Sequence, residues 1–101
     1  MNRLDGKTAL ISGASRGIGA AAANLMISVG ANVTIGDVLK SKGEEWAKTL
    51  GPKAKFIYLD VTDENDWSNA VNLAVDQFDG LDILVNNAGL FLGRDFADIS
   101  L

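Results

Sequence analysis

Residues 8–19 read TALISGASRGIG, a short apolar run followed by a glycine-rich turn. The first five, Thr8–Ser12, have the length and composition of a strand that is buried on both faces. From Gly17 onward, apolar residues recur at every third or fourth position, which is the spacing of a helix. The stretch therefore predicts a strand, a tight turn and a helix, in that order.

The turn between this strand and helix has glycines at positions 13, 17 and 19. A pyrophosphate is bound where backbone N–H groups and the positive end of a helix point at it and no side chain blocks the approach. Gly13 permits the turn, Gly17 lets the backbone come close, and Gly19 lets the helix pack against the strand. The spacing differs from the common Gly-x-Gly-x-x-Gly motif, and a turn without a ligand is the alternative.

The rest of the chain alternates short apolar runs with amphipathic stretches. The predicted strands cover residues 8–12, 32–36, 55–59 and 81–85. Each predicted helix is expected to bury one apolar face. In the first helix, 17–29, this face consists of Ile18, Ala21, Ala22, Leu25, Met26 and Val29. In the second it consists of Leu39, Gly43, Trp46, Ala47 and Leu50, and in the third of Trp67, Ala70, Val71, Ala74, Val75 and Phe78. Strands separated by such helices favour an α/β fold with a doubly wound parallel sheet in the order 3-2-1-4.

Several residues have the chemistry of helix ends. Gly30 and Gly80 are expected to close the first and third helices, and Gly51-Pro52 the second. Thr62 is expected to cap the third helix, which would leave Asp60 free for another role. Acidic residues gather there (Asp60, Asp63, Glu64 and Asp66), but they lack calcium-loop spacing, so we predict no metal site.

The composition removes several classes of function. The 101 residues are 48% hydrophobic and carry a net charge of -4, with no basic run for nucleic acid. The chain has no cysteine or histidine, so it cannot build a Ser-His-Asp, Cys-His or Cys/His zinc site. It has neither a signal peptide nor an apolar stretch of roughly 18 residues. We therefore expect a cytoplasmic protein without nucleic-acid or membrane partners.

Two motifs resemble those of the short-chain dehydrogenase/reductase family. Ser12–Gly19 resembles the family's Thr-Gly-x-x-x-Gly-x-Gly turn, with Ser12 in place of the usual threonine. Residues 86–89, Asn-Asn-Ala-Gly, resemble the motif that follows the family's fourth strand, and Asp60-Val61 also matches. The resemblance runs from about Leu4 to Gly89 and implies a Rossmann-type sheet. It is nearest to bacterial hydroxysteroid-type and related secondary alcohol dehydrogenases.

The resemblance implies a nicotinamide dinucleotide as the bound small molecule. The cofactor-binding residues it implies are Gly13, Ser15, Arg16, Gly17, Ile18, Gly19, Asp37, Asp60, Val61, Asn87, Ala88 and Gly89. Asp37 ends the second predicted strand, where a carboxylate accepts hydrogen bonds from the adenosine ribose and repels the 2′-phosphate of NADP(H). Arg16 argues for NADP(H), because a basic residue in this turn of similar enzymes can hold that phosphate. We expect NAD(H), with NADP(H) as the alternative.

The resemblance also implies roles for the later loops. Asp60 would accept a hydrogen bond from the adenine amino group, with Val61 beside the ring. Asn87 and its neighbours would pass along the cofactor's ribose, although a purely structural role for Asn87 is equally open. Trp46 and Trp67 lie on helix faces and are expected to be core residues rather than stacking partners of a ligand.

The chemistry of the resembled family depends on a tyrosine, a lysine four residues later, a serine and an asparagine. The only tyrosine here is Tyr58, with Thr62 four residues on, so we predict no catalytic residue in this chain. A fourth strand left at the sheet edge would expose unpaired backbone. We therefore expect residues 1–101 to form one NAD(P)-binding domain that is incomplete at its C-terminal end, from a parent that is tetrameric by resemblance.

Two functions from different classes remain open. The first is an NAD(H)-dependent oxidoreductase acting on a secondary alcohol or ketone, of which this chain carries the cofactor-binding half. The second is a half-domain that binds NAD(H) without catalysis, as a sensor or interaction module. A Tyr-x-x-x-Lys motif beyond Leu101 in the parent gene would favour the first.

Overall fold

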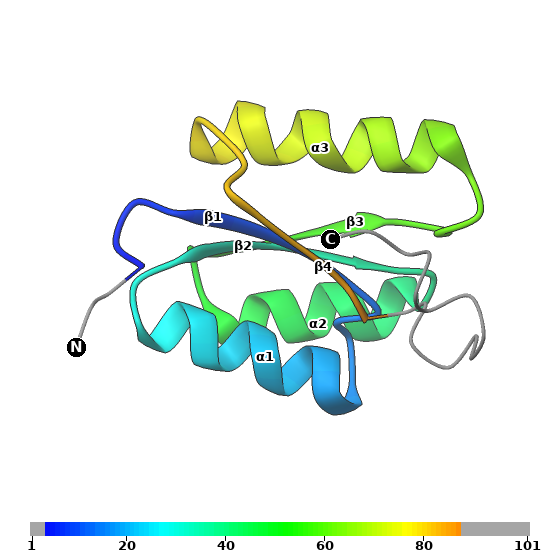
Figure 1. Cartoon of the computed structure of the whole chain (residues 1–101). Helices are drawn as coiled ribbons and strands as arrows, with labels where there is room; N and C mark the ends of the chain where they lie inside the picture. Colours follow the sequence, from blue (N-terminus) through cyan, green and yellow to red (C-terminus); the bar gives the residue numbers. More distant parts are fainter. Residues whose placement is uncertain (1–3, 88–101) are drawn as a thin grey trace.

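In a computed structural model of the protein, the structure is described for residues 4–87. Strands and helices alternate along the chain (Figure 1). The strands are β1 (Thr8–Ser12), β2 (Asn32–Asp37), β3 (Ala54–Tyr58) and β4 (Ile83–Asn86), and the helices are α1 (Gly17–Ser28), α2 (Lys40–Leu50) and α3 (Glu64–Phe78). Each predicted element is present, with bounds within about two residues of those predicted, as is usual for element ends.

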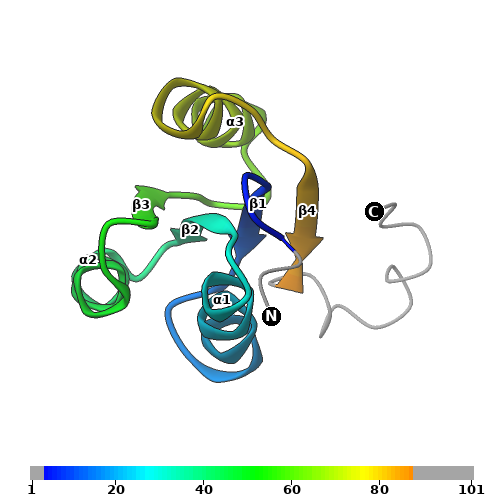
Figure 2. The same cartoon turned by 90° about the vertical axis from the view of Figure 1, so that its left-hand side faces the viewer.

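The strands form one parallel sheet in the order β3-β2-β1-β4, which confirms the predicted order and fold class. Helices α1 and α2 cover one face of the sheet and α3 covers the other (Figure 2). The register sets Ser12, at the end of β1, beside Gly36 of β2 and Asn86 of β4. Because the strands are parallel, their carboxyl ends meet at one edge of the sheet.

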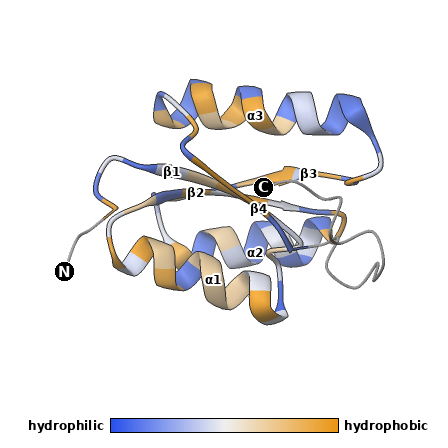
Figure 3. Cartoon of the chain, in the orientation of Figure 1, coloured by the Kyte–Doolittle hydropathy of each residue, from blue (hydrophilic) through white to orange (hydrophobic). Residues whose placement is uncertain are grey.

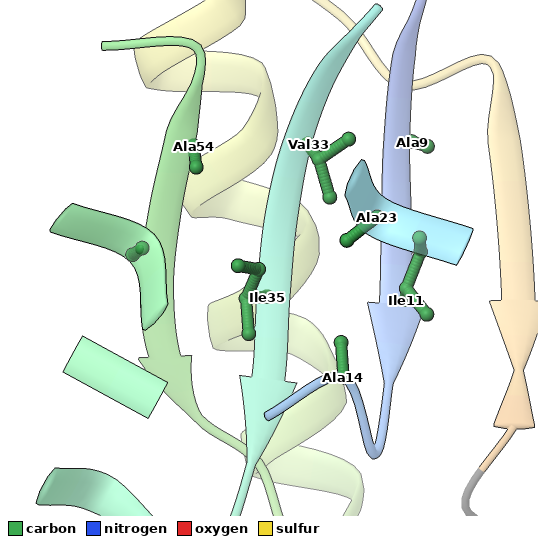
Figure 4. Packing of buried hydrophobic residues seen from close by; sticks show 8 residues of the cluster. Ala9, Ile11, Ala14, Ala23, Val33, Ile35 and Ala54 are labelled. Carbon is green, nitrogen blue, oxygen red and sulfur yellow. The ribbon is translucent and has the colours of Figure 1, made fainter. Parts of the chain in front are cut away.

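The core has one layer on each face of the sheet. The layer between the sheet and helices α1 and α2 consists of Ala9, Ile11, Ala14, Ala23, Val33, Ile35, Ala47 and Ala54 (Figure 4). The layer between the sheet and α3 consists of Leu10, Leu59 and Ala70. The helices contribute mainly alanine to both layers, which lets them lie close to the larger strand residues.

The buried face of α1 differs from the prediction. Gly19 and Ala23 are its buried residues, whereas Ile18 is 77% exposed and Leu25 is 64% exposed. Figure 3 shows apolar colour along most of α1 and mostly polar colour on α2. Because α1 is apolar on nearly every side, hydrophobic spacing does not select one face, and the smallest residues, which permit the closest approach, set the contact.

The two ends of α3 also differ from the prediction. Asp63, rather than Thr62, caps the helix, and its side chain accepts hydrogen bonds from the N–H groups of Asn65 and Asp66. At the other end Asp79 takes the left-handed conformation, at φ 68°, in place of Gly80. Aspartate tolerates both positions, because its short carboxylate bonds to nearby backbone.

The helices among residues 4–87 are too short or too polar to cross a membrane. The longest of those described, α3, has 15 residues, which corresponds to about 22 Å against about 30 Å of hydrocarbon in a bilayer. In the same part of the chain no cluster of acidic residues is arranged to hold a metal ion.

Candidate cofactor-binding site

The predicted binding residues of several loops meet at the carboxyl edge of the sheet. The loops that follow β1, β2 and β3 leave this same edge, and Asn87 follows β4 there. In open α/β sheets, this edge is where ligands bind. The structure therefore gathers the predicted residues up to Asn87, while Ala88 and Gly89 lie outside the described residues.

The three glycines of the turn after β1 differ in what surrounds them. Gly13 and Gly17 have φ of 67° and 63°, which residues with a side chain rarely adopt. A Cβ on Gly17 would meet no atom within 4 Å. A Cβ on Gly19 would instead overlap the carbonyl oxygen of Gly13 and approach the side-chain amide of Asn87 to 2.8 Å. The space next to Gly17 is therefore open, whereas Gly19 allows α1 to pack directly against the backbone of the glycine turn.

Within the part of the chain that the structure describes, no side chain accepts a hydrogen bond from the first turn of α1. Arg16 occupies the cap position in an extended conformation, and its side chain makes no capping hydrogen bond. The first turn contains no acidic residue, and Ile18 points into solvent. The N–H groups that begin the helix, and the positive end of its dipole, are therefore available to an anion.

Asp37 lies against the glycine turn. Its carboxylate accepts hydrogen bonds from the backbone N–H of Ser15, at 3.1 Å, and from that of Leu39, also at 3.1 Å. Asp37 is only 8% exposed, and the neighbouring Ser15 is equally buried. These hydrogen bonds fix the Asp37 carboxylate, at the end of β2, against the glycine turn that follows β1.

Arg16 stands on the exposed side of the same turn. Within residues 4–87, no carboxylate pairs with its guanidinium. Asp37 and Arg16 therefore do not neutralise each other, and the site offers both a negative and a positive side chain near the start of α1. The structure therefore does not decide between Asp37, which favours NAD(H), and Arg16, which favours NADP(H).

The expectation that Asp60 is free was wrong for one of its oxygens. Oδ1 accepts hydrogen bonds from the hydroxyl of Thr62, at 2.6 Å, and from its backbone N–H, at 2.9 Å. The hydroxyl, and to a lesser degree the N–H, lowers the pKa of Asp60 below its usual 3.8. Thr62 is engaged in this way because Asp63 takes the cap position. The second oxygen, Oδ2, has no hydrogen-bond partner among residues 4–87.

The loop after β3 is held by residues of α3. Asp66 accepts a hydrogen bond from the backbone N–H of Asp60 at 3.0 Å, and the indole Nε1 of Trp67 donates to the carbonyl of Val61 at 2.8 Å. The backbone N–H of Val61 has no acceptor among the described residues. Sequence reasoning missed both side chains, because nothing in a hydrophobic pattern shows where an indole N–H points.

Both tryptophans pack against the core, as predicted. Trp67 contacts the cluster under α3, and Trp46 contacts the cluster under α1 and α2. The indole N–H of Trp46 is buried and has no partner in the part of the chain described. The two residues therefore share a packing role, and only the Trp67 indole bonds to a loop at the candidate site.

Two asparagines, one at the end of β4 and one just after it, fix the end of β1. The hydroxyl of Ser12 donates to Oδ1 of Asn86 at 2.9 Å. The side-chain amide of Asn87 donates to the carbonyl of Gly13 at 3.2 Å. Asn87 thus has the structural role that the sequence left open, and the contact between Ser12 and Asn86 was not predicted.

Two other features lie away from this edge. Tyr58, the only tyrosine of the chain, is 48% exposed on the edge strand β3, and β2 separates β3 from β1. An open hollow of about 1030 Å³ lies between α2 and β3 and includes Glu44, Lys48 and Phe56. It contains none of the predicted binding residues, so the candidate site is the edge with the glycine turn and not this hollow.

Known proteins are similar to this chain over most of its length. The family model of the short chain dehydrogenases matches residues 7–101. The chain is 47% identical over 88 residues to 3-alpha-(or 20-beta)-hydroxysteroid dehydrogenase of Mycobacterium tuberculosis, covering 87% of this chain and 34% of that protein. It is 44% identical over 99 residues to trans-4-hydroxycyclohexanecarboxylate dehydrogenase of Sinomonas cyclohexanicum, covering 89% of this chain and 38% of that protein.

A solved structure is also similar. The crystal structure of 3-ketoacyl-(acyl-carrier-protein) reductase from Brucella melitensis, complexed with NADH, matches with a TM-score of 0.78 and 38% sequence identity. The match covers 80% of this chain and 34% of the other. The chain thus spans about a third of the length of the relatives it matches.

Proposed function

The chain belongs to the short-chain dehydrogenase family, and from this premise we propose that it is the cofactor-binding part of an NAD(H)-dependent oxidoreductase. The proposed reaction moves a hydride between the nicotinamide and a secondary alcohol or ketone. The observation that carries the proposal is the uncapped start of α1 behind the glycine turn, with Asp37 bonded to Ser15 beside it.

The pyrophosphate of the dinucleotide would be held at the start of α1. The first-turn N–H groups have no side-chain acceptor among residues 4–87, and Gly17 leaves space for a close approach. Ser15, Arg16 and Ile18 surround this position, with Arg16 supplying a positive charge. An anion held in this way gains both hydrogen bonds and the favourable end of the helix dipole.

The adenosine ribose would lie beside Asp37. Its carboxylate can accept hydrogen bonds from ribose hydroxyls, and it would repel the additional phosphate of NADP(H). Two unit charges about 4 Å apart repel by about 4 kcal/mol at an effective dielectric constant of about 20. Arg16 opposes this effect, but it is exposed to solvent, where its attraction is screened. The balance supports NAD(H).

The adenine would lie at the loop after β3. Oδ2 of Asp60 is an acceptor, and the N–H of Val61 is a donor, and neither has a partner in residues 4–87. The Watson–Crick edge of adenine offers the complementary pair, with a donor at the 6-amino group and an acceptor at N1. The two free groups support the roles assigned to Asp60 and Val61.

The bound nicotinamide would supply or accept the hydride, and the residues of this chain would bind and orient the dinucleotide. Tyr58 is the only tyrosine, and no lysine stands four residues after it. The proton-transfer groups of the proposed enzyme would therefore come from outside this chain. The names of two relatives describe hydroxysteroid and hydroxycyclohexanecarboxylate substrates, both secondary alcohols, which supports that substrate class.

Calorimetric titration of the chain with NADH and NADPH tests the proposal. The wild-type chain is expected to bind NADH more tightly than NADPH. Asp37→Asn removes the charge and is expected to shift the ratio of the two dissociation constants toward NADPH by up to about a thousandfold. Asp76→Asn, an exposed acid of α3, is the matched control and should leave the ratio unchanged. A folded chain that binds neither nucleotide, or prefers NADPH, would contradict the proposal.

A further inference from the structure

Hydrogen bonds hold the loop Asp60–Asp63 in an arrangement in which a donor and an acceptor on neighbouring residues have no partner among residues 4–87. Asp66 fixes the peptide before Asp60 by accepting its N–H, and Trp67 fixes the peptide after Val61 by donating to its carbonyl. Between them, the carbonyl of Asp60 accepts from the N–H of Asp63 at 2.9 Å. Two of the polar groups that this set of bonds does not use are the N–H of Val61 and Oδ2 of Asp60.

We infer that Asp66 and Trp67 are positioning residues that set the base specificity of the site, by holding Asp60 and Val61 in register with the edge of adenine. They are adjacent in sequence on the first turns of α3, so one rigid element bonds to the loop on both sides of the Asp60–Val61 peptide. The inference rests on the proposed function, because it concerns the adenine half of the same dinucleotide site.

The burial of these residues fits a positioning role. Trp67 is half-buried and packs with Val61 against the cluster that contains Leu59. Leu59 is itself 2% exposed, and its N–H donates to the carbonyl of Asp37 at 3.0 Å. The loop is thus anchored at its start by the sheet and farther along by α3. A site that is ordered before binding loses less conformational entropy when the ligand binds.

The recognised feature is the order of donor and acceptor on the base. Adenine presents a donor at position 6 and an acceptor at position 1, which match Asp60 Oδ2 and the N–H of Val61. Hypoxanthine presents an oxygen at position 6 and an N–H at position 1, which oppose both groups. Reduced nicotinamide hypoxanthine dinucleotide therefore differs from NADH only where the loop would read it.

The test compares the dissociation constants of NADH and of reduced nicotinamide hypoxanthine dinucleotide for the chain and its variants. The wild-type chain is expected to prefer NADH by about tenfold, because the analogue leaves two polar groups unmatched. Trp67→Phe keeps an aromatic ring but deletes the N–H, and the preference is expected to fall to about twofold. Trp46→Phe is the matched control and should keep the preference, because the Trp46 indole N–H bonds to nothing in residues 4–87.

A second pair of variants keeps the inference testable if Trp67→Phe does not fold. Asp66→Ala removes the acceptor of the Asp60 N–H and should reduce the preference in the same way. Asp66→Asn keeps an oxygen at that position and should restore it. Equal weakening of both dinucleotides by Trp67→Phe and Asp66→Ala, with an unchanged ratio, would mean a merely structural role and would overturn the inference.

The wild-type chain separates this inference from the proposed function. If it binds NADH without preferring it to the hypoxanthine analogue, the inference fails and the proposed function stands. If it binds neither dinucleotide, the proposed function itself fails, and the inference falls with it.

Discussion

Two helices begin at the same edge of the sheet, and their first turns are built in opposite ways. At α3, the Asp63 side chain accepts two backbone N–H groups, and Glu64 and Asp66 add further negative charge. At α1, Arg16 makes no capping bond and the first turn has no acid. Among the described residues, carboxylates thus satisfy the positive end of α3, and none occupies that of α1. An exposed helix start that lacks its own cap is suited to an anion from outside.

The loops that precede these helices also differ in what maintains their conformation. The turn before α1 depends on glycines at positions where a side chain would either be strained or collide. The loop before α3 depends on side-chain hydrogen bonds that Thr62 and Trp67 donate and Asp66 accepts. The first loop is therefore expected to be sensitive to added atoms, and the second to deleted ones.

The largest effect is expected at Gly19. In Gly19→Ala the new methyl group would overlap the Gly13 carbonyl, which is backbone and cannot rotate away. We expect the free energy of unfolding in urea to fall by about 3 kcal/mol and NADH binding to be lost. Gly17→Ala is the matched control, because its methyl group meets open space and only the positive φ is strained, at a cost of about 1 kcal/mol. Equal costs at the two positions would contradict the close approach of α1 to the turn.

A smaller effect is expected when α1 is given a capping aspartate like the one at the start of α3. Arg16→Asp places a capping carboxylate at the start of α1, where the backbone is already extended as a cap requires. We expect the unfolding free energy to rise by about 1 kcal/mol, while NADH binding weakens about tenfold because the new charge repels pyrophosphate.

Removal of the capping aspartate from α3 is the control for the addition of one to α1. Asp63→Ala removes the cap and should lower the unfolding free energy by about 1 kcal/mol without weakening NADH binding. Urea unfolding and calorimetry measure the two quantities. Arg16→Asp that binds NADH as tightly as the wild type would mean that the start of α1 is not the anion site.

The smallest effect is expected at Thr62. The Thr62 hydroxyl is the main cause of the lowered pKa of Asp60, so Thr62→Val should raise that pKa toward 3.8. Because the folded-state pKa is lowered, the stabilising contribution of Asp60 is present above pH 3.8 and is lost as the pH falls through the folded value. Carbon NMR of the Asp60 carboxyl group follows the titration. An unchanged midpoint in Thr62→Val would show that the hydroxyl does not act on Asp60.

The fold was largely predictable, because each strand is a short apolar run and each helix lies between two of them. Thr8–Ser12 and the alternation after it were enough to predict the parallel sheet and the order β3-β2-β1-β4. The face of α1 was not predictable by spacing. Ile18 and Leu25 fit the helical period as well as Ala22 and Met26 do, and only contact with the sheet separates them.

The candidate site was predictable in position but not in its bonds. Gly13, Asp37 and Asp60 follow strands, so a parallel sheet had to bring them to one edge. The partner of each polar atom depends on distances of a few tenths of an ångström. Sequence therefore could not show that Asp63 would take the cap that Thr62 was expected to fill, or that Trp67 would bond to Val61.

We propose that the open start of α1 binds the dinucleotide and that the capped start of α3 does not. The most direct test of this proposal is an amide NMR titration of the ¹⁵N-labelled chain with NADH. The largest shifts are predicted for the N–H groups of Gly17, Ile18 and Gly19, with smaller ones at Val61 and none of that size at Asn65. Shifts that are absent from the start of α1, or larger at the start of α3, would contradict the account.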